Sequence, residues 1–183
     1  MRLDQTPVVG KPDNQSAVDA NAAPCDMTAR EITLSRWQQL QRSGLTVHSL
    51  QTFYARHKYL VMSRDIESYR RIGKMLATVT ATELPVVAQQ TIEVIMEALQ
   101  KAPTRGGHTN VLQHIRGYLK RVLNADEKAA LTESIERYHS GDIPLSVPLE
   151  LLQQYFREHP DAYIEQQVFM QIYLDTQYSR DHI

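Results

Sequence analysis

The sequence has almost no cysteine and no long apolar segment. Cys25 is the only cysteine among 183 residues, so the chain can form no internal disulfide and cannot alone ligate an iron–sulfur cluster. No apolar run approaches the roughly 20 residues that span a bilayer, and the N-terminus lacks the apolar core of a secretory signal. These absences predict a cytoplasmic protein with no cofactor and no membrane partner.

Catalytic and metal-binding motifs are lacking as well. The sequence contains no GxSxG elbow, no P-loop and no HExxH pair. His108 and His114 are six residues apart, which places them on different sides of a helix and argues against a shared metal. We therefore expect no metal site, and the motifs identify no catalytic residue.

What is present is the composition of a globular domain, with 42% hydrophobic and 22% charged residues. Residues 1–26 mix Pro, Gly, Asn and Ala without periodicity and are predicted to form a flexible, disordered leader. A single helical domain is expected over residues 27–175, followed by a short tail over residues 176–183.

Apolar periodicity and capping residues indicate helices throughout this domain. Thr28 and Glu31 have capping-box spacing, Pro85 suits a first helical turn, and Asn124 suits an N-cap. No segment alternates as a strand would, and no internal repeat is visible. We expect an all-α, single-domain compact array of about seven to eight helices: 28–43, 46–62, 65–80, 85–101, 109–123, 125–139, and two that begin at Pro148 and Pro160.

The formal net charge of −1 hides a gradient along the chain. Residues 28–121 contain 14 Lys and Arg against 6 Asp and Glu, whereas residues 126–183 contain 4 against 11. The two parts could neutralise each other by packing together, or the basic part could present a face to a polyanion. Charge alone favours the first alternative and leaves the second open.

The predicted helix over residues 46–62 places His57 within an apolar stripe. The stripe is made of Leu50, Phe53, Tyr54, Leu60 and Val61. His57 is then either a core residue with hydrogen-bonded ring nitrogens or a residue facing a cleft, where a shifted pKa serves proton transfer or a phosphate contact. Arg56, Lys58 and Tyr59 are expected on or near the solvent side.

Glycines mark the predicted helix over residues 109–123, whose buried side is expected to include Tyr118. The turn before it, from Thr104 to Gly107, has free amides beside a helix N-terminus and is a candidate for binding an anion. Gly117 lies inside the helix, where glycine costs about 1 kcal/mol relative to alanine. We therefore expect a neighbouring helix or a ligand backbone to approach closely there.

The predicted helix over residues 65–80 adds to a basic surface. It exposes Arg70, Arg71 and Lys74 beside the cations of the preceding helix. Such side chains neutralise phosphates, and an exposed tyrosine such as Tyr59 can stack on an unpaired base.

Three ordered blocks of the sequence resemble the bacterial YbgA family. They are FYARHKYLVMSRDIESYRRIGKMLA, GGHTNVLQHIRGYLKRVL and SGDIPLSVPLELLQQYFREHPDAYIEQQVF. This family is a helical domain of poorly defined function, found free-standing or fused to an iron–sulfur domain that removes sulfur from thiolated pyrimidines. The resemblance implies a tRNA-binding module and RNA-facing roles for the matching residues His57, Lys58, His108, Asn110, His114, Arg116, Tyr118 and Lys120. A desulfidase would have to be a partner protein acting in trans, because only Cys25 is available here.

Charge and resemblance together predict an accessory domain that binds structured RNA such as tRNA through phosphates on a basic helical face. The predicted RNA-binding residues are Arg56, Lys58, Tyr59, Arg70, Arg71, Lys74, Asn110, His114, Arg116 and Lys120. One alternative is a small-molecule enzyme or sensor whose pocket is formed by His57, His108, His114 and Tyr118. Another is a protein-interaction module, for example a homo-oligomer in which acidic C-terminal helices meet a partner's basic face.

Overall fold

The computed structural model describes residues 26–178, with side chains from residue 28 to residue 173. The predicted leader lies outside this range apart from residue 26, as do the last five residues of the predicted tail. Within the range the chain forms nine helices and no strand, which confirms the all-α prediction. None of these helices is long and apolar enough to cross a membrane.

The helices are α1 (Asp26–Ser43), α2 (Val47–Met62), α3 (Ile66–Thr78), α4 (Leu84–Ala98), α5 (Arg105–Leu119), α6 (Ala125–Ser140), α7 (Ser146–Glu158), α8 (Ala162–Glu165) and α9 (Val168–Tyr178). Several boundaries follow from capping residues. The Thr46 and Asp65 side chains accept backbone hydrogen bonds at the starts of α2 and α3. Asn124 and Glu127 form a capping box at the start of α6, and Gly141, with φ 92°, ends that helix.

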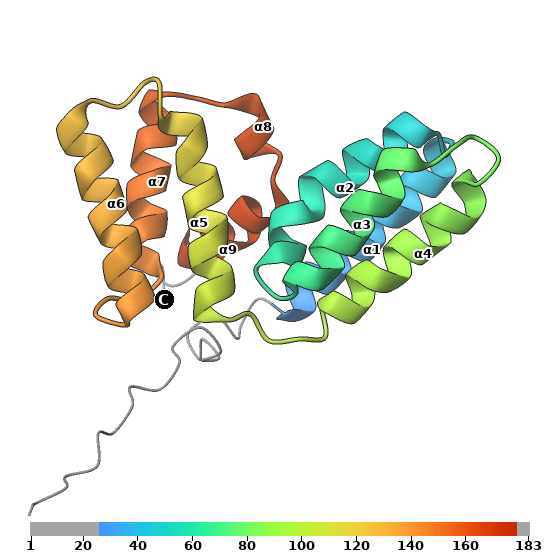
Figure 1. Cartoon of the computed structure of the whole chain (residues 1–183), viewed down its shortest axis with the longest axis horizontal. Helices are drawn as coiled ribbons and strands as arrows, with labels where there is room; N and C mark the ends of the chain where they lie inside the picture. Colours follow the sequence, from blue (N-terminus) through green and yellow to red (C-terminus); the bar gives the residue numbers. More distant parts are fainter. Residues whose placement is uncertain (1–25, 179–183) are drawn as a thin grey trace, which may run out of the picture.

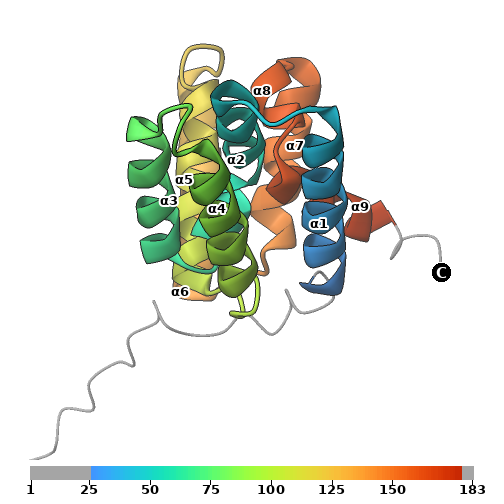
Figure 2. The same cartoon turned by 90° about the vertical axis from the view of Figure 1, so that its right-hand side faces the viewer.

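Helix α2 is the centre of the arrangement, because it contacts α1, α3, α4, α5 and α9. In Figure 1, α1–α4 form one group of neighbouring helices, α5–α7 form a second group, and α8 and α9 lie between the two groups. Figure 2, turned by 90°, shows α9 next to α1. The chain segment around α8 and α9 is thereby brought beside the α1–α2 pair.

The predicted apolar stripe of α2 is confirmed. Leu50 and Leu60 are fully buried, Phe53 and Tyr54 are nearly so, and His57 is buried among them. The structure adds Tyr59 and Met62 to the buried residues of this helix, so neighbouring helices cover more of the surface of α2 than the predicted stripe.

Three predicted boundaries are wrong. Helix α1 begins before Thr28, which lies within the helix and cannot act as its cap. Helix α5 begins at Arg105 because Thr104 caps it by accepting from the Gly107 amide, so the predicted glycine turn is the first helical turn. The segment after Pro160 forms two helices, the first capped by Asp161.

Candidate functional site

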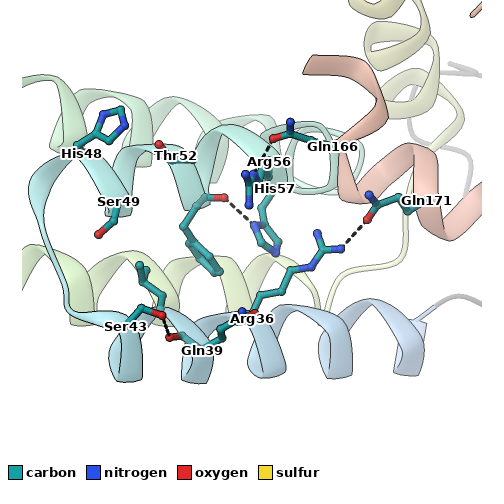
Figure 3. Close-up of a pocket in the computed structure, with 12 residues that line it drawn as sticks. Arg36, Gln39, Ser43, His48, Ser49, Thr52, Arg56, His57, Gln166 and Gln171 are labelled. Carbon is teal, nitrogen blue, oxygen red and sulfur yellow. Dashed lines mark hydrogen bonds between the residues drawn. The ribbon is translucent and has the colours of Figure 1, made fainter. Parts of the chain in front are cut away.

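A polar cleft of about 500 Å³ lies between α1, α2 and the segment around the start of α9. We call it the arginine cleft, and define it by Arg36, Arg56, His57, Gln166 and Gln171. Figure 3 shows that α1 contributes Arg36, that α2 contributes Arg56 and His57, and that the two glutamines reach in from the C-terminal part of the chain. Four hydroxyl- or imidazole-bearing side chains line its other end: Ser43, His48, Ser49 and Thr52.

His57 is both a core residue and a lining residue of this cleft. Its Nδ1 lies 2.7 Å from the carbonyl oxygen of Phe53. A carbonyl oxygen only accepts, so Nδ1 carries the proton and neutral His57 presents a bare lone pair at Nε2. This Nε2 atom is buried and has no hydrogen-bond partner. An unpartnered acceptor of this kind is costly and calls for an explanation.

The environment of His57 keeps its imidazole neutral. Burial lowers the pKa of His57 to about 4, and the positive charges of Arg36 and Arg56 add to this effect, while the hydrogen bond to Phe53 opposes it. At neutral pH the ring is therefore a hydrogen-bond acceptor at Nε2 and carries no charge.

Two glutamines hold the two arginines in place. Arg36 Nη2 donates to Gln171 Oε1 at 2.6 Å, and Arg56 Nε donates to Gln166 Oε1 at 3.1 Å. Gln171 is itself fixed, because its amide donates to the carbonyl oxygen of Glu165 at 2.9 Å. No carboxylate of the described part of the chain pairs with either arginine.

The two guanidinium groups affect each other. The pKa of Arg36 is lowered by burial and, in addition, by the charge of Arg56. The cleft thus holds two neighbouring positive charges with only neutral partners, and an anion is the group that would relieve their repulsion.

The predicted histidine pocket does not form. His57 lines the arginine cleft, whereas His108 is buried with Nδ1 2.9 Å from Tyr138 Oη and Nε2 2.7 Å from Tyr173 Oη. His114 is exposed, with its ring centre 6.2 Å from that of Tyr59. His108 is a satisfied core histidine that connects α5, α6 and α9.

The prediction that Tyr59 stacks on a base from the solvent side is wrong. Tyr59 is only 2% exposed, and burial raises its pKa. Tyr118, predicted to be buried, is 38% exposed instead. Its ring stacks on that of Tyr163 with a centroid distance of 5.6 Å and an interplanar angle of 16°. The aromatic side chain available to a ligand is therefore on α5.

A cation lies next to these rings. The Nζ atom of Lys58 is 4.7 Å from the ring centre of Tyr59 and 5.1 Å from that of Tyr163. We call Lys58, His114, Tyr118 and Tyr163 the tyrosine surface. It combines residues of α2, α5 and α8, which lie close together in Figure 1.

The other predicted RNA-binding residues differ in how free they are. Arg70 pairs with Glu67 at 2.7 Å, and Arg116 donates to Thr132 Oγ1 at 2.7 Å. Asn110 is half-buried and lines a second cleft, together with Arg64 and Asp65. Of the predicted RNA-binding cations, Arg71, Lys74 and Lys120 are exposed and have no partner in the described part of the chain.

Four hydrogen bonds between the basic and acidic parts of the chain join an arginine to a neutral group. Four arginines of the basic part donate across to oxygens that carry no charge: Arg36 to Gln171, Arg56 to Gln166, Arg105 to the Tyr138 carbonyl, and Arg116 to Thr132. These four hydrogen bonds therefore orient the arginines without neutralising their charge.

The close approach expected at Gly117 is found elsewhere. A β-carbon at Gly117 would meet nothing within 4 Å. At Gly107 it would lie 2.1 Å from the carbonyl oxygen of Ser63. Among the described residues, no group of three His, Cys, Asp or Glu side chains could hold a metal.

Sequence reasoning missed Arg36, Gln166, Gln171 and Tyr163 as site residues. Arg36 shares a face of its helix with Leu40 and Ser43, which also line the cleft, but this spacing does not reveal what the face meets. The two glutamines lie more than 100 positions from their arginines in the sequence, so no local pattern connects them.

Residues 58–173 match the family described as "Protein of unknown function (DUF1722)". The chain is also 26% identical over 145 residues to "Uncharacterized protein YbgA" of Escherichia coli (strain K12), with 79% of this chain and 86% of that protein covered. No solved structure matches the chain. Since the family match spans well over half of the sequence and agrees with the YbgA resemblance, the chain belongs to this YbgA-like DUF1722 family.

Proposed function

We propose that the protein binds structured RNA such as tRNA, and that the tyrosine surface contacts an unpaired base. The observation that carries this proposal is the Tyr118–Tyr163 stack, with Tyr118 38% exposed and the Lys58 ammonium 5.1 Å from the Tyr163 ring centre. An exposed tyrosine can stack on any of the four bases, because each base has a π face. A nearby lysine attracts the phosphate next to the stacked base.

Free cations supply the remaining phosphate contacts. Arg71 and Lys74 on α3 and Lys120 after α5 are exposed and have no partner in the described part of the chain. Each can neutralise a phosphate without first breaking an internal contact. Arg70 must first leave Glu67, and Arg116 must leave Thr132, so we expect smaller contributions from them.

The test is titration of an unmodified tRNA transcript at several salt concentrations. Y118A should weaken binding by about tenfold, whereas Y118F, which keeps the ring, should bind as the wild type does. R71E/K74E should reduce the magnitude of the slope of log affinity against log salt by about 0.7–0.9 for each phosphate that is no longer neutralised. K128E is the matched control, because it reverses an exposed charge on the acidic helix α6.

Three results would contradict the proposal. They are a salt slope near zero, equal weakening by K128E and R71E/K74E, and equal affinity of the Y118A and Y118F proteins.

A further inference from the structure

We propose that the arginine cleft binds a small phosphorylated compound that also carries a hydroxyl group. Arg36 and Arg56 would bind the phosphate, and Nε2 of His57 would accept a hydrogen bond from the hydroxyl. This inference is independent of RNA binding, because it uses another face of α2 and none of the residues of the tyrosine surface.

The phosphate assignment rests on the two guanidinium groups. Each is held by a glutamine through one hydrogen bond, Arg36 to Gln171 and Arg56 to Gln166, and each has further N–H donors to offer. Glutamine orients an arginine without neutralising it, so the positive charge remains available to a ligand. A guanidinium group binds phosphate through several charge-assisted hydrogen bonds. A carboxylate partner would already have used the N–H donors that form these bonds.

The hydroxyl assignment rests on His57. Its Nδ1 proton is committed to the Phe53 carbonyl, so Nε2 can only accept. The fully charged phosphate of an ester is also only an acceptor, which means that it cannot satisfy Nε2. A hydroxyl on the same ligand can. Nε2 is buried, so a hydroxyl reaches it only when a neighbouring side chain shifts, and the Arg36 side chain, which lies beside the ring and lines the cleft (Figure 3), is the one that a bound phosphate would draw away.

The rest of the cleft suits a hydroxylated ligand. At about 500 Å³ it is larger than a phosphate group needs. Its far end presents the side chain of Thr52, whose hydroxyl can both donate and accept hydrogen bonds. The neighbouring Ser49 hydroxyl is already used in the capping box of α2, where it accepts from the Thr46 amide and donates to the Thr46 carbonyl oxygen.

Two probes that differ only in hydroxyl groups separate the two assignments. At pH 8 n-propyl phosphate and glycerol 3-phosphate carry the same phosphate dianion on the same three-carbon chain, but only glycerol 3-phosphate has hydroxyls. We expect glycerol 3-phosphate to bind at least about tenfold more tightly by isothermal titration calorimetry. R36Q and R56Q should each weaken both probes by about tenfold or more.

The control is R42Q, which removes an exposed arginine on α1 that does not line the cleft. For His57, H57N keeps a donor near the Nδ1 position but loses the Nε2 acceptor, and it should remove the preference for glycerol 3-phosphate. H57Q places an acceptor near the Nε2 position and should retain part of the preference. Circular dichroism verifies that each variant is folded. R56Q changes an exposed residue, so its effect on binding can be measured without disturbing the core.

The proposal is overturned if glycerol 3-phosphate does not bind at millimolar concentration. It is also overturned if R42Q weakens binding as much as R56Q does, or if n-propyl phosphate and glycerol 3-phosphate bind the wild type equally. RNA affinity of the Y118A and R71E/K74E proteins is measured separately, so failure of one proposal leaves the other testable.

Discussion

Gly107 packs directly against the backbone of Ser63. A β-carbon at Gly107 would lie 2.1 Å from the Ser63 carbonyl oxygen and 2.8 Å from its carbonyl carbon. The same oxygen accepts a hydrogen bond from the Thr104 amide at 3.3 Å. The end of α2 and the first turn of α5 are therefore held together backbone to backbone, at a position that admits no side chain.

Alanine at Gly107 should consequently destabilise the fold. We expect G107A to lower the free energy of unfolding by about 3 kcal/mol, because a backbone atom cannot give way as a flexible side chain can. G117A is the matched control in the same helix. With open space around it, it should raise the free energy of unfolding by up to about 1 kcal/mol. Urea denaturation followed by circular dichroism measures both, and similar effects of the two substitutions would contradict the packing at Gly107.

His57 should make stability depend on pH. Its pKa is lowered to about 4 in the folded protein from 6.5, so between these values the unfolded chain takes up a proton that the folded chain does not. Stability should therefore fall as the pH falls from about 6.5 to 4. The expected loss between pH 7.5 and pH 5 is about 2 kcal/mol.

H57Q isolates this contribution, because glutamine does not titrate. The difference in unfolding free energy between wild type and H57Q should change by about 2 kcal/mol over the same pH interval. A difference that stays constant from pH 7.5 to pH 5 would mean that the His57 pKa is not depressed.

Two histidines of α5 should differ sharply in their structural importance. H108L leaves the hydroxyl groups of Tyr138 and Tyr173 without their imidazole partner inside the core, and we expect a loss of about 2–4 kcal/mol. H114L changes an exposed side chain on the same helix and should alter stability by less than about 0.5 kcal/mol. Thermal unfolding compares the two, and equal losses would be inconsistent with this core network.

Asp65 has two roles that substitutions can separate. Its carboxylate accepts from the amides of Glu67 and Ser68 at the start of α3, and it also pairs with Lys101 from the link between α4 and α5. D65A removes both roles and should cost about 1–2 kcal/mol. D65N keeps a good N-cap and loses only the charge, so it should cost less than about 1 kcal/mol. Chemical denaturation measures the free energy of unfolding of both variants. An equal loss in D65A and D65N would mean that the ion pair with Lys101, and not the helix cap, accounts for the stabilisation by Asp65.

Sequence patterns predicted the helices well where the determinants are local. The apolar stripe of α2, the predicted helix starts at residues 46 and 65, and the cap at Asn124 depend on residues within one or two turns of each other. Thr28 shows the limit, because its capping-box spacing with Glu31 occurs inside a helix that had already begun.

The sites depend on packing that no local pattern encodes. Tyr59 is buried and Tyr118 exposed, the reverse of the expectation, because α5 packs against α2 over Tyr59 while Tyr118 lies further out and stacks on Tyr163. His57 was correctly placed in the apolar stripe, and both of its alternatives hold in part, since it is buried and also lines a cleft. The partners of Arg36 and Arg56 come from the far end of the chain, so they follow from the tertiary fold alone.

Trp37, the only tryptophan in the sequence, is 7% exposed and its ring centre lies 5.4 Å from that of Phe53. The Phe53 ring is in turn 4.2 Å from the His57 ring. Indole fluorescence responds to nearby charge and is quenched by a protonated imidazole. The tryptophan emission of this protein therefore comes from a single indole, which is separated from the His57 ring by the Phe53 ring alone. Protonation of His57 and filling of the cleft can thus be followed without any label.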